Sequence, residues 1–118
     1  MIINHTDMKT ETREKMRDGN GITTITHLVN CENEKNVRLI AEITLAPGAS
    51  IGEHCHDSET EYYLILSGNG LVNDDGTEVE VKAGDSVITG GGASHSIANT
   101  GEVPLVFNAV IVTYGTSL

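Results

Sequence analysis

Short segments rich in β-branched residues, each followed by a turn, run through the chain from residue 22 onward. Within Thr77–Lys82, Val79 and Val81 alternate with charged residues, and this period of two is typical of a strand with one buried face. No helical pattern long enough for a β-α-β crossover lies between the segments, and their regular spacing predicts an antiparallel all-β sandwich or barrel. The expected strands are Ile22–Val29, Val37–Leu45, Ile51–His56, Glu61–Leu66, Leu71–Asn73, Thr77–Lys82, Ser86–Thr89, Ser94–Asn99 and Val103–Tyr114.

The length of 118 residues indicates a single domain. Residues 6–18 are polar and contain one favourable helical pair, Glu11 and Lys15, but only a poor apolar stripe. We expect a short helix or an arm that packs on another part of the chain. The predicted organisation is therefore an N-terminal arm, residues 1–20, followed by a β-barrel domain, residues 21–118.

Charge and hydropathy exclude several classes of partner. Seven basic against seventeen acidic residues give a net charge of −10, and residues 1–20 carry four of each sign, so the barrel domain holds the whole excess. Nucleic acid binding needs clustered Lys and Arg, which are lacking here. No apolar run approaches the roughly 20 residues of a membrane span. The N-terminus has no secretory signal pattern, so we expect a cytoplasmic protein in which Cys31 and Cys55 are reduced thiols.

Three histidines and one glutamate lie at positions that suit metal binding. His54 and His56 are two residues apart, so on a strand both point to one face while Cys55 points to the other. Glu61 follows after a polar turn and can add an oxygen ligand, and His95 follows a glycine-rich loop and can add a third nitrogen. Such a set suits one divalent transition metal, Mn, Fe, Co, Ni, Cu or Zn, with positions left open for a ligand.

Two motifs around these residues resemble those of the cupin superfamily. The first is Gly48-x5-His54-x-His56-x4-Glu61-x6-Gly68, and the second is Gly84-x5-Gly90-x-Gly92-x2-His95-x3-Asn99. One position departs from the family pattern, because Gly90 stands where the family usually has proline, and we expect a more flexible loop there. The fifteen residues between the motifs match the short spacer of small single-domain cupins.

The resemblance implies an antiparallel jelly-roll barrel, or double-stranded β-helix, with His54, His56, Glu61 and His95 as ligands of a metal in its mouth. Cupins include dioxygenases, isomerases, decarboxylases, lyases and binding domains, so the fold does not select a reaction. Our leading hypothesis is a metal-dependent enzyme that oxygenates, decarboxylates or isomerises a small polar or carboxylate-bearing molecule. The alternatives are a non-enzymatic module that binds or senses a small ligand, and a structural metalloprotein that unfolds without its metal.

Two further residues are candidates for the pocket. Tyr63 shares the face of Glu61 and is either a proton donor or a core tyrosine. Arg38 is the best candidate to bind a substrate carboxylate, against the alternative of a surface position. His5 and His27 are expected to be packing or surface residues.

The segment Glu61–Leu66 is apolar on both faces, with Tyr62, Leu64 and Leu66 alternating with Tyr63 and Ile65. A strand of this kind is covered on its outer side as well. We therefore expect a homodimer.

Overall fold

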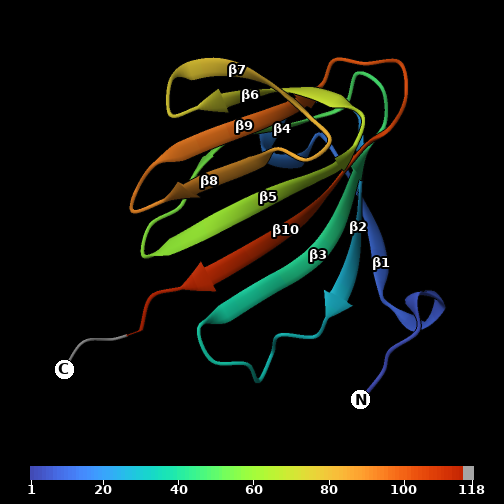
Figure 1. The fold of residues 1–118 in the computed structure, drawn as a ribbon, viewed down its shortest axis with the longest axis vertical. Coiled ribbons are helices and arrows are strands. Elements are labelled where there is room, and N and C mark those ends of the chain that lie inside the picture. The colour runs from blue at the N-terminus through green and yellow to red at the C-terminus, as the bar shows by residue number, and fades with distance from the viewer. Residues whose placement is uncertain (116–118) are drawn as a thin grey trace.

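The computed structural model describes residues 1–115, and the end of the expected barrel domain at residue 118 lies outside them. Two antiparallel sheets face each other (Figure 1). The larger sheet has the strand order β1-β2-β3-β10-β5-β8. Its strands are β1 (Thr10–Glu14), β2 (Ile22–Val29), β3 (Val37–Leu45), β5 (Glu59–Ser67), β8 (Ser86–Gly90) and β10 (Leu105–Thr113).

The smaller sheet has the order β4-β9-β6-β7. Its strands are β4 (Ser50–Cys55), β6 (Asn69–Asp74), β7 (Thr77–Lys82) and β9 (Ser94–Asn99). All strand pairs are antiparallel, and the chain crosses repeatedly from one sheet to the other, as a jelly-roll barrel requires. The expected fold class is confirmed.

The apolar faces of the two sheets meet in one core. From the larger sheet, Phe107, Tyr63 and Leu45 are almost fully buried, and from the smaller sheet Ile51 and Ile97 are buried equally. Each of these residues alternates with exposed or half-buried neighbours on its strand, which is the pattern that burial of one sheet face produces. The expected strands are all present, with ends that differ by a few residues.

The first twenty residues contain a strand and two short 3₁₀ turns, η1 (His5–Asp7) and η2 (Met16–Asp18), so of the two expected alternatives, a short helix or a packed arm, the structure shows the arm. Strand β1 pairs with β2 and extends the larger sheet, from Thr10 opposite Thr26 to Glu14 opposite Ile22. The arm is therefore hydrogen-bonded to the barrel as an added edge strand.

The turn η2 packs closely on the start of β4. A Cβ atom on Gly52 would collide with the carbonyl oxygen of Arg17, and one on Gly19 would collide with that of Ser50. Hydrogen bonds from the Ser50 amide to the Asn20 carbonyl, 2.8 Å, and from the Asn20 amide to Ser50 Oγ, 2.9 Å, hold the two segments together. These contacts hold Arg17 against β4 at Gly52.

Within residues 1–115, no helix is long and apolar enough to cross a membrane. Both Cys31 and Cys55 are free thiols, as expected.

Candidate metal centre

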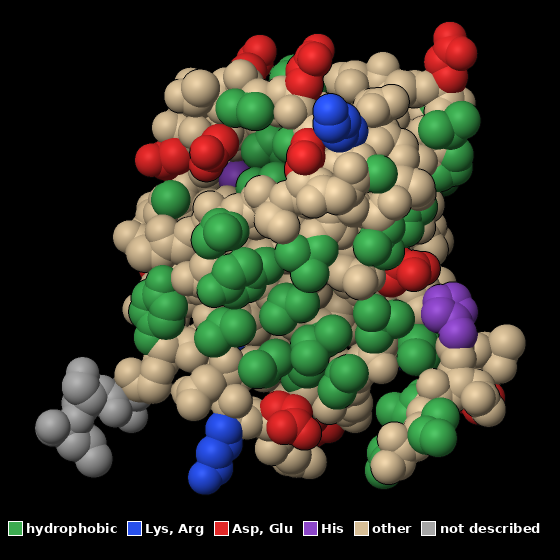
Figure 2. Space-filling model, viewed as in Figure 1, with side chains coloured by type: hydrophobic (Ala, Val, Ile, Leu, Met, Phe, Trp, Pro, Cys, Tyr) green, Lys and Arg blue, Asp and Glu red, His purple; other side chains and the backbone are tan. Residues whose placement is uncertain are grey.

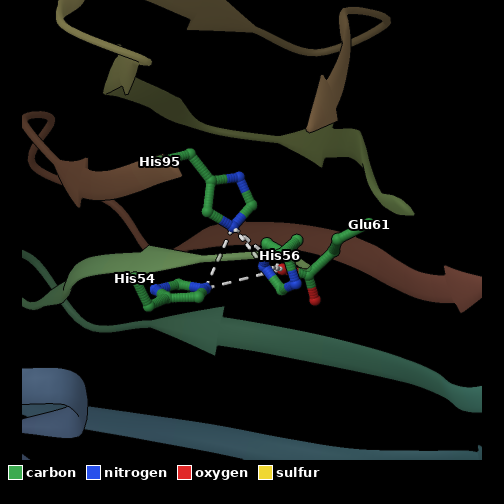
Figure 3. A group of neighbouring side chains, drawn as sticks. All are labelled: His54, His56, Glu61 and His95. Carbon is green, nitrogen blue, oxygen red and sulfur yellow. Dashed lines mark hydrogen bonds and ion pairs between the residues drawn. The ribbon is translucent and has the colours of Figure 1, made fainter. Parts of the chain in front are cut away.

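The four candidate ligands come together between the two sheets, as Figure 3 shows. His54 on β4 lies directly opposite His95 on β9, His56 follows the end of β4, and Glu61 reaches in from β5 of the other sheet. One ligand atom from each residue lies within 4.8 Å of all the others. His56, Glu61 and His95 are buried and His54 is half-buried.

A β-bulge in β4 sets the position of His54. The register passes from Ile51 opposite Ile97 to His54 opposite His95, so β4 holds one residue more than β9 over this interval. Such a bulge redirects the side chains that follow it. His54 and His56 both point toward the cluster, whereas Cys55 points away and its thiol contacts the Gly92 carbonyl, as the period of two predicts.

The outer ring nitrogens of two histidines fix their tautomers. Nδ1–H of His54 donates to the Gly52 carbonyl at 2.8 Å, and Nδ1–H of His56 donates to the Glu59 carboxylate at 2.5 Å. Because these acceptors require a proton on Nδ1, both Nε2 atoms carry a lone pair directed into the cluster.

The distances within the cluster fit a divalent cation. His95 Nε2 lies 3.0 Å from the Nε2 atoms of His54 and His56 and 2.9 Å from Glu61 Oε1, and His56 Nε2 lies 3.0 Å from the same oxygen. Two atoms that each lie about 2.1 Å from one ion, at a right angle, are about 3.0 Å apart. Inward lone pairs and a buried carboxylate at this spacing are a donor set that could hold a divalent transition metal.

The pKa shifts are consistent with a deprotonated donor set. Burial alone would raise the pKa of Glu61. Without a metal, the rings of His54 and His95 are hydrogen-bond donors to this carboxylate when their Nε2 atoms carry a proton, and this outweighs burial and lowers the pKa of Glu61 to about 2. Burial lowers the pKa of His95, against the opposing effect of Glu61. Both changes favour the forms that bind metal, a carboxylate and a neutral imidazole.

Tyr63 lies directly behind the cluster. Its ring stacks on that of His95, with centroids 4.6 Å apart and planes at 15°, and also contacts Phe107. Burial, together with the negative charge of Glu61, raises the pKa of the Tyr63 hydroxyl well above its usual value. Tyr63 is thus a core residue whose ring packs on His95, and its role as a proton donor stays a prediction.

Arg38 is near the cluster but already engaged. Its Nε and Nη2 donate to the two oxygens of Glu59 at 2.7 and 2.9 Å, and Glu59 in turn holds His56. The guanidinium fork that we expected to bind a substrate carboxylate therefore faces a carboxylate of the protein itself. A substrate-binding role for Arg38 stays a prediction.

A cavity of about 140 Å³ opens onto His54, His56, Glu61 and Tyr63. Aliphatic side chains of both sheets form part of its walls, and His27 and Arg38 line it as well. A water molecule occupies about 30 Å³ of liquid, so this space suits a ligand of only a few heavy atoms. A larger hollow of about 530 Å³ lies beyond His27 and Arg38 and contains none of the four clustered residues.

The arm contributes side chains to this cavity that the sequence did not single out: Glu11, Arg13, Met16 and Arg17. Arg13 is paired with Glu11 at 2.8 Å, whereas Arg17 makes no ion pair with any residue that the structure describes. The net charge of the arm, which is zero, did not reveal these positive charges at the cavity, because a sum over the segment does not say which side chains line the cavity. The positive φ of 54° at Arg17 could not be predicted from the sequence either, because the residue there is not glycine or asparagine.

Fold and site together define a small β-barrel protein with a buried cluster of three histidines and one glutamate. Residues 41–113 match the family model of the cupin domain, and the chain belongs to the cupin superfamily. The resemblance seen in the two motifs is confirmed.

This chain is similar in sequence and in fold to proteins from Thermotoga maritima. An oxalate-binding protein of this organism is 42% identical over 113 residues, which cover 95% of this chain and 93% of the relative. The crystal structure of a protein described as a predicted oxalate decarboxylase is similar with a TM-score of 0.91 and 41% identity, over 96% of this chain and 99% of that one. A sugar phosphate isomerase of the cupin superfamily from Silicibacter pomeroyi, 16% identical with a TM-score of 0.75 over 95% of this chain and 75% of that chain, shares the fold.

Proposed function

We propose that this protein binds a small dicarboxylate of the oxalate class on a divalent transition metal held by His54, His56, Glu61 and His95. The convergence of four ligand atoms, three imidazole nitrogens and one carboxylate oxygen, between the sheets is the observation that carries the proposal. A bound ion would supply a Lewis acid with open positions for two oxygens of the ligand. A set of three imidazole nitrogens and one carboxylate oxygen can hold Mn, Fe, Co, Ni, Cu or Zn, so the donor set leaves the choice of element open.

Charge and size favour a small anion. One carboxylate ligand neutralises half of the charge of a divalent ion, so the occupied site attracts negative charge although the chain carries −10. Arg17 adds an unpaired positive charge at the wall of the cavity, and about 140 Å³ limits the ligand to a few heavy atoms. The 42% identity to an oxalate-binding protein supports the same class of ligand.

The residues of this chain have separable roles in the proposal. Glu61 and the three histidines hold the ion, and aliphatic side chains of both sheets close part of the cavity. Arg17 pairs with a carboxylate oxygen of the ligand that does not contact the ion. Tyr63 holds His95 through ring stacking and offers a hydroxyl that stays protonated at neutral pH.

Turnover of the same ligand is the second candidate. Decarboxylation of a dicarboxylate requires a proton for the carbon that loses CO₂, and the hydroxyl of Tyr63, which lines the cavity beside the cluster, is a candidate donor although its raised pKa makes it a weak acid. The similarity to a protein described as a predicted oxalate decarboxylase favours this reaction over oxygenation or isomerisation.

Calorimetry of the metal-loaded protein, dialysed free of excess metal, tests the proposal. Oxalate should bind, malonate should bind more weakly because the cavity is small, and acetate should bind weakest since it lacks the second carboxylate. Chelation of the metal should abolish all three signals. Oxalate binding that persists without metal, or equal affinity for acetate and oxalate, would contradict the proposal. Formate and CO₂ measured in the same mixtures then separate turnover from binding alone.

The outer face of the larger sheet supports the proposal of a homodimer. Ile40, Val110, Tyr62 and Ile88 lie opposite one another across β3, β10, β5 and β8 and form an uncharged row. Figure 2 shows apolar side chains gathered on the face over these strands, with acidic groups at its margins. Two copies of a chain with a charge of −10 repel each other least where both are uncharged, so we propose that a second copy covers this face.

Replacing Ile88 by glutamate should convert the dimer to a monomer in sedimentation velocity. Ile88 is 63% exposed, so the substitution leaves the fold intact while placing a buried charge in the interface. Val103→Glu is the matched control, because Val103 is 57% exposed and lies in the loop between β9 and β10. A wild-type protein that is monomeric at high micromolar concentration would overturn the dimer and leave the face to another partner.

A further inference from the structure

A chain of three polar side chains leads from the candidate ligand His56 to the rim of the barrel. His56 Nδ1–H donates to Glu59 Oε2, and Arg38 donates to both oxygens of Glu59. The side chain of Glu59 is 12% exposed and that of Arg38 is 50% exposed. Glu59 is thus a mostly buried carboxylate that accepts hydrogen bonds from the candidate ligand His56 and from the cation Arg38.

The backbone is built to bring these three residues together. Arg38 on β3 must reach across β10 to contact Glu59 on β5, because the strand order is β3-β10-β5. The register between β10 and β3 passes from Ile111 opposite Leu39 to Val112 opposite Val37, so Arg38 has no partner in the ladder. A β-bulge of this kind re-aims the side chain of the extra residue.

Gly90 is part of the same arrangement. It lies opposite Thr60 in the β5–β8 ladder, and a Cβ atom there would lie 2.8 Å from the Glu59 carbonyl oxygen and would collide with the Thr60 hydroxyl. The Gly91 amide donates to the Glu59 carbonyl and the Gly92 amide donates to the His56 carbonyl. The glycine that departs from the family pattern therefore permits close packing of the loop on Glu59, where the sequence suggested a more flexible loop.

The three clustered histidines differ in what supports them. Nδ1 of His54 is bound to a backbone carbonyl, and Nδ1 of His95 has no hydrogen-bond partner among residues 1–115. Only His56, of the three, is supported by a carboxylate, which is the stronger acceptor. A carboxylate behind a ligating histidine fixes its tautomer and orientation and makes it a better electron donor to a metal.

We propose that Glu59 is a positioning residue for His56 and that Arg38 acts through Glu59, so that this pair sets the metal affinity of the site. The proposal rests on the metal site proposed above and assigns residues that lie outside the four ligands. It also gives Arg38 a role that does not require contact with the bound molecule.

Metal affinity measured by competition with a chromophoric chelator tests the proposal. Glu59→Gln should weaken binding by about 10–100-fold, which is typical when a residue supporting a ligating histidine is lost. Glu78→Gln is the matched control, because Glu78 is an exposed residue of β7 with the same change of charge. Equal affinities of these two variants would overturn the role of Glu59.

The Arg38→Gln variant distinguishes positioning from simple electrostatics, because the two predict opposite changes in metal affinity. Removal of a positive charge near a cation site should strengthen metal binding if charge alone acts. Positioning predicts the opposite, namely weaker binding, because Glu59 loses the group that holds it in place. In the Glu59→Gln background, Arg38→Gln should cause no further loss. Stronger binding by the single variant, or additive losses in the double variant, would overturn the role of Arg38.

A second measurement does not depend on metal. In the metal-free protein, ¹⁵N chemical shifts should place the ring proton of His56 on Nδ1, and Glu59→Ala should redistribute it over both nitrogens. His54, which is supported by the Gly52 carbonyl, should keep its tautomer in the variant and serves as the internal control. An unchanged His56 tautomer in Glu59→Ala would contradict the proposal. A wild-type protein that takes up no metal would refute the proposed function, while this measurement would still decide the role of Glu59.

Discussion

Replacing His56 by alanine should abolish near-stoichiometric metal binding while the barrel stays folded. Nε2 of His56 is one of the four convergent atoms, and His56 is the clustered histidine supported by a carboxylate. The loss of affinity should exceed the about 10–100-fold that a supporting residue contributes, since here a ligand itself is removed. Elemental analysis of the tag-free protein, after incubation with each metal and dialysis, measures the effect.

His27→Ala is the control for this prediction. His27 lines the same cavity and is half-buried, but its Nε2 lies 3.8 Å from Glu11 and it is not part of the cluster. Its metal content should equal that of the wild type. Full metal content in His56→Ala would show that the ligands are assigned wrongly.

Circular dichroism of the same proteins tests the alternative that the metal is structural and that the chain unfolds without it. The hydrogen bond from the His56 amide to the Ala93 carbonyl does not depend on the side chain, so the variant should keep its strands. The chelated wild type should also remain folded. If both unfolded, the ion would hold the fold together, as in a structural metalloprotein.

Replacing Arg17 by asparagine should weaken dicarboxylate binding by about 10–100-fold, the range of a hydrogen bond to a charged group, with unchanged metal content. Arg17 is exposed, lines the cavity and makes no ion pair with any described residue. Asparagine tolerates the positive φ of 54° at this position, so the turn η2 keeps its conformation. Calorimetry with oxalate on the metal-loaded protein measures the loss.

Lys82→Asn removes the same charge on β7, outside this cavity, and should leave oxalate affinity unchanged. Acetate binding should fall less than oxalate binding in Arg17→Asn, because a single carboxylate can be held by the ion alone. If Arg17→Asn binds oxalate as tightly as the wild type, the arm does not recognise the ligand. Loss of metal in the same variant would mean that the arm acts on the cluster rather than on the ligand.

Local patterns in the sequence predicted the strands and the composition of the cluster. Alternation of apolar and polar residues depends on the period of the backbone, so segments such as Thr77–Lys82 could be recognised without knowing their partners. The spacing of His54 and His56 places both on one face for the same reason. Gly48, Gly68 and Gly84, three glycines of the two motifs, have φ angles of 82°, 88° and 94°, a region that glycine adopts readily because it has no Cβ atom.

Strand β1 could not be predicted in the same way. Its sequence, TETRE, has no apolar alternation because only one of its residues is even half-buried. It becomes a strand because β2 offers an unpaired edge, and pairing of this kind depends on the tertiary arrangement. The helical alternative for this segment rested on the Glu11–Lys15 pair, which is worth only about 0.2–0.5 kcal/mol.

The sequence by itself determined the fold class and the four residues of the candidate metal centre, since both depend on spacing along one strand or on motifs that lie close together. Only the tertiary structure decided what surrounds the centre. Arg38 meets Glu59 across β10 because a β-bulge re-aims its side chain, and Arg17 reaches the cavity because Gly19 and Gly52 let η2 lie on β4. These contacts depend on strand order, register and close backbone packing, which arise from the whole chain and leave no local pattern in the sequence.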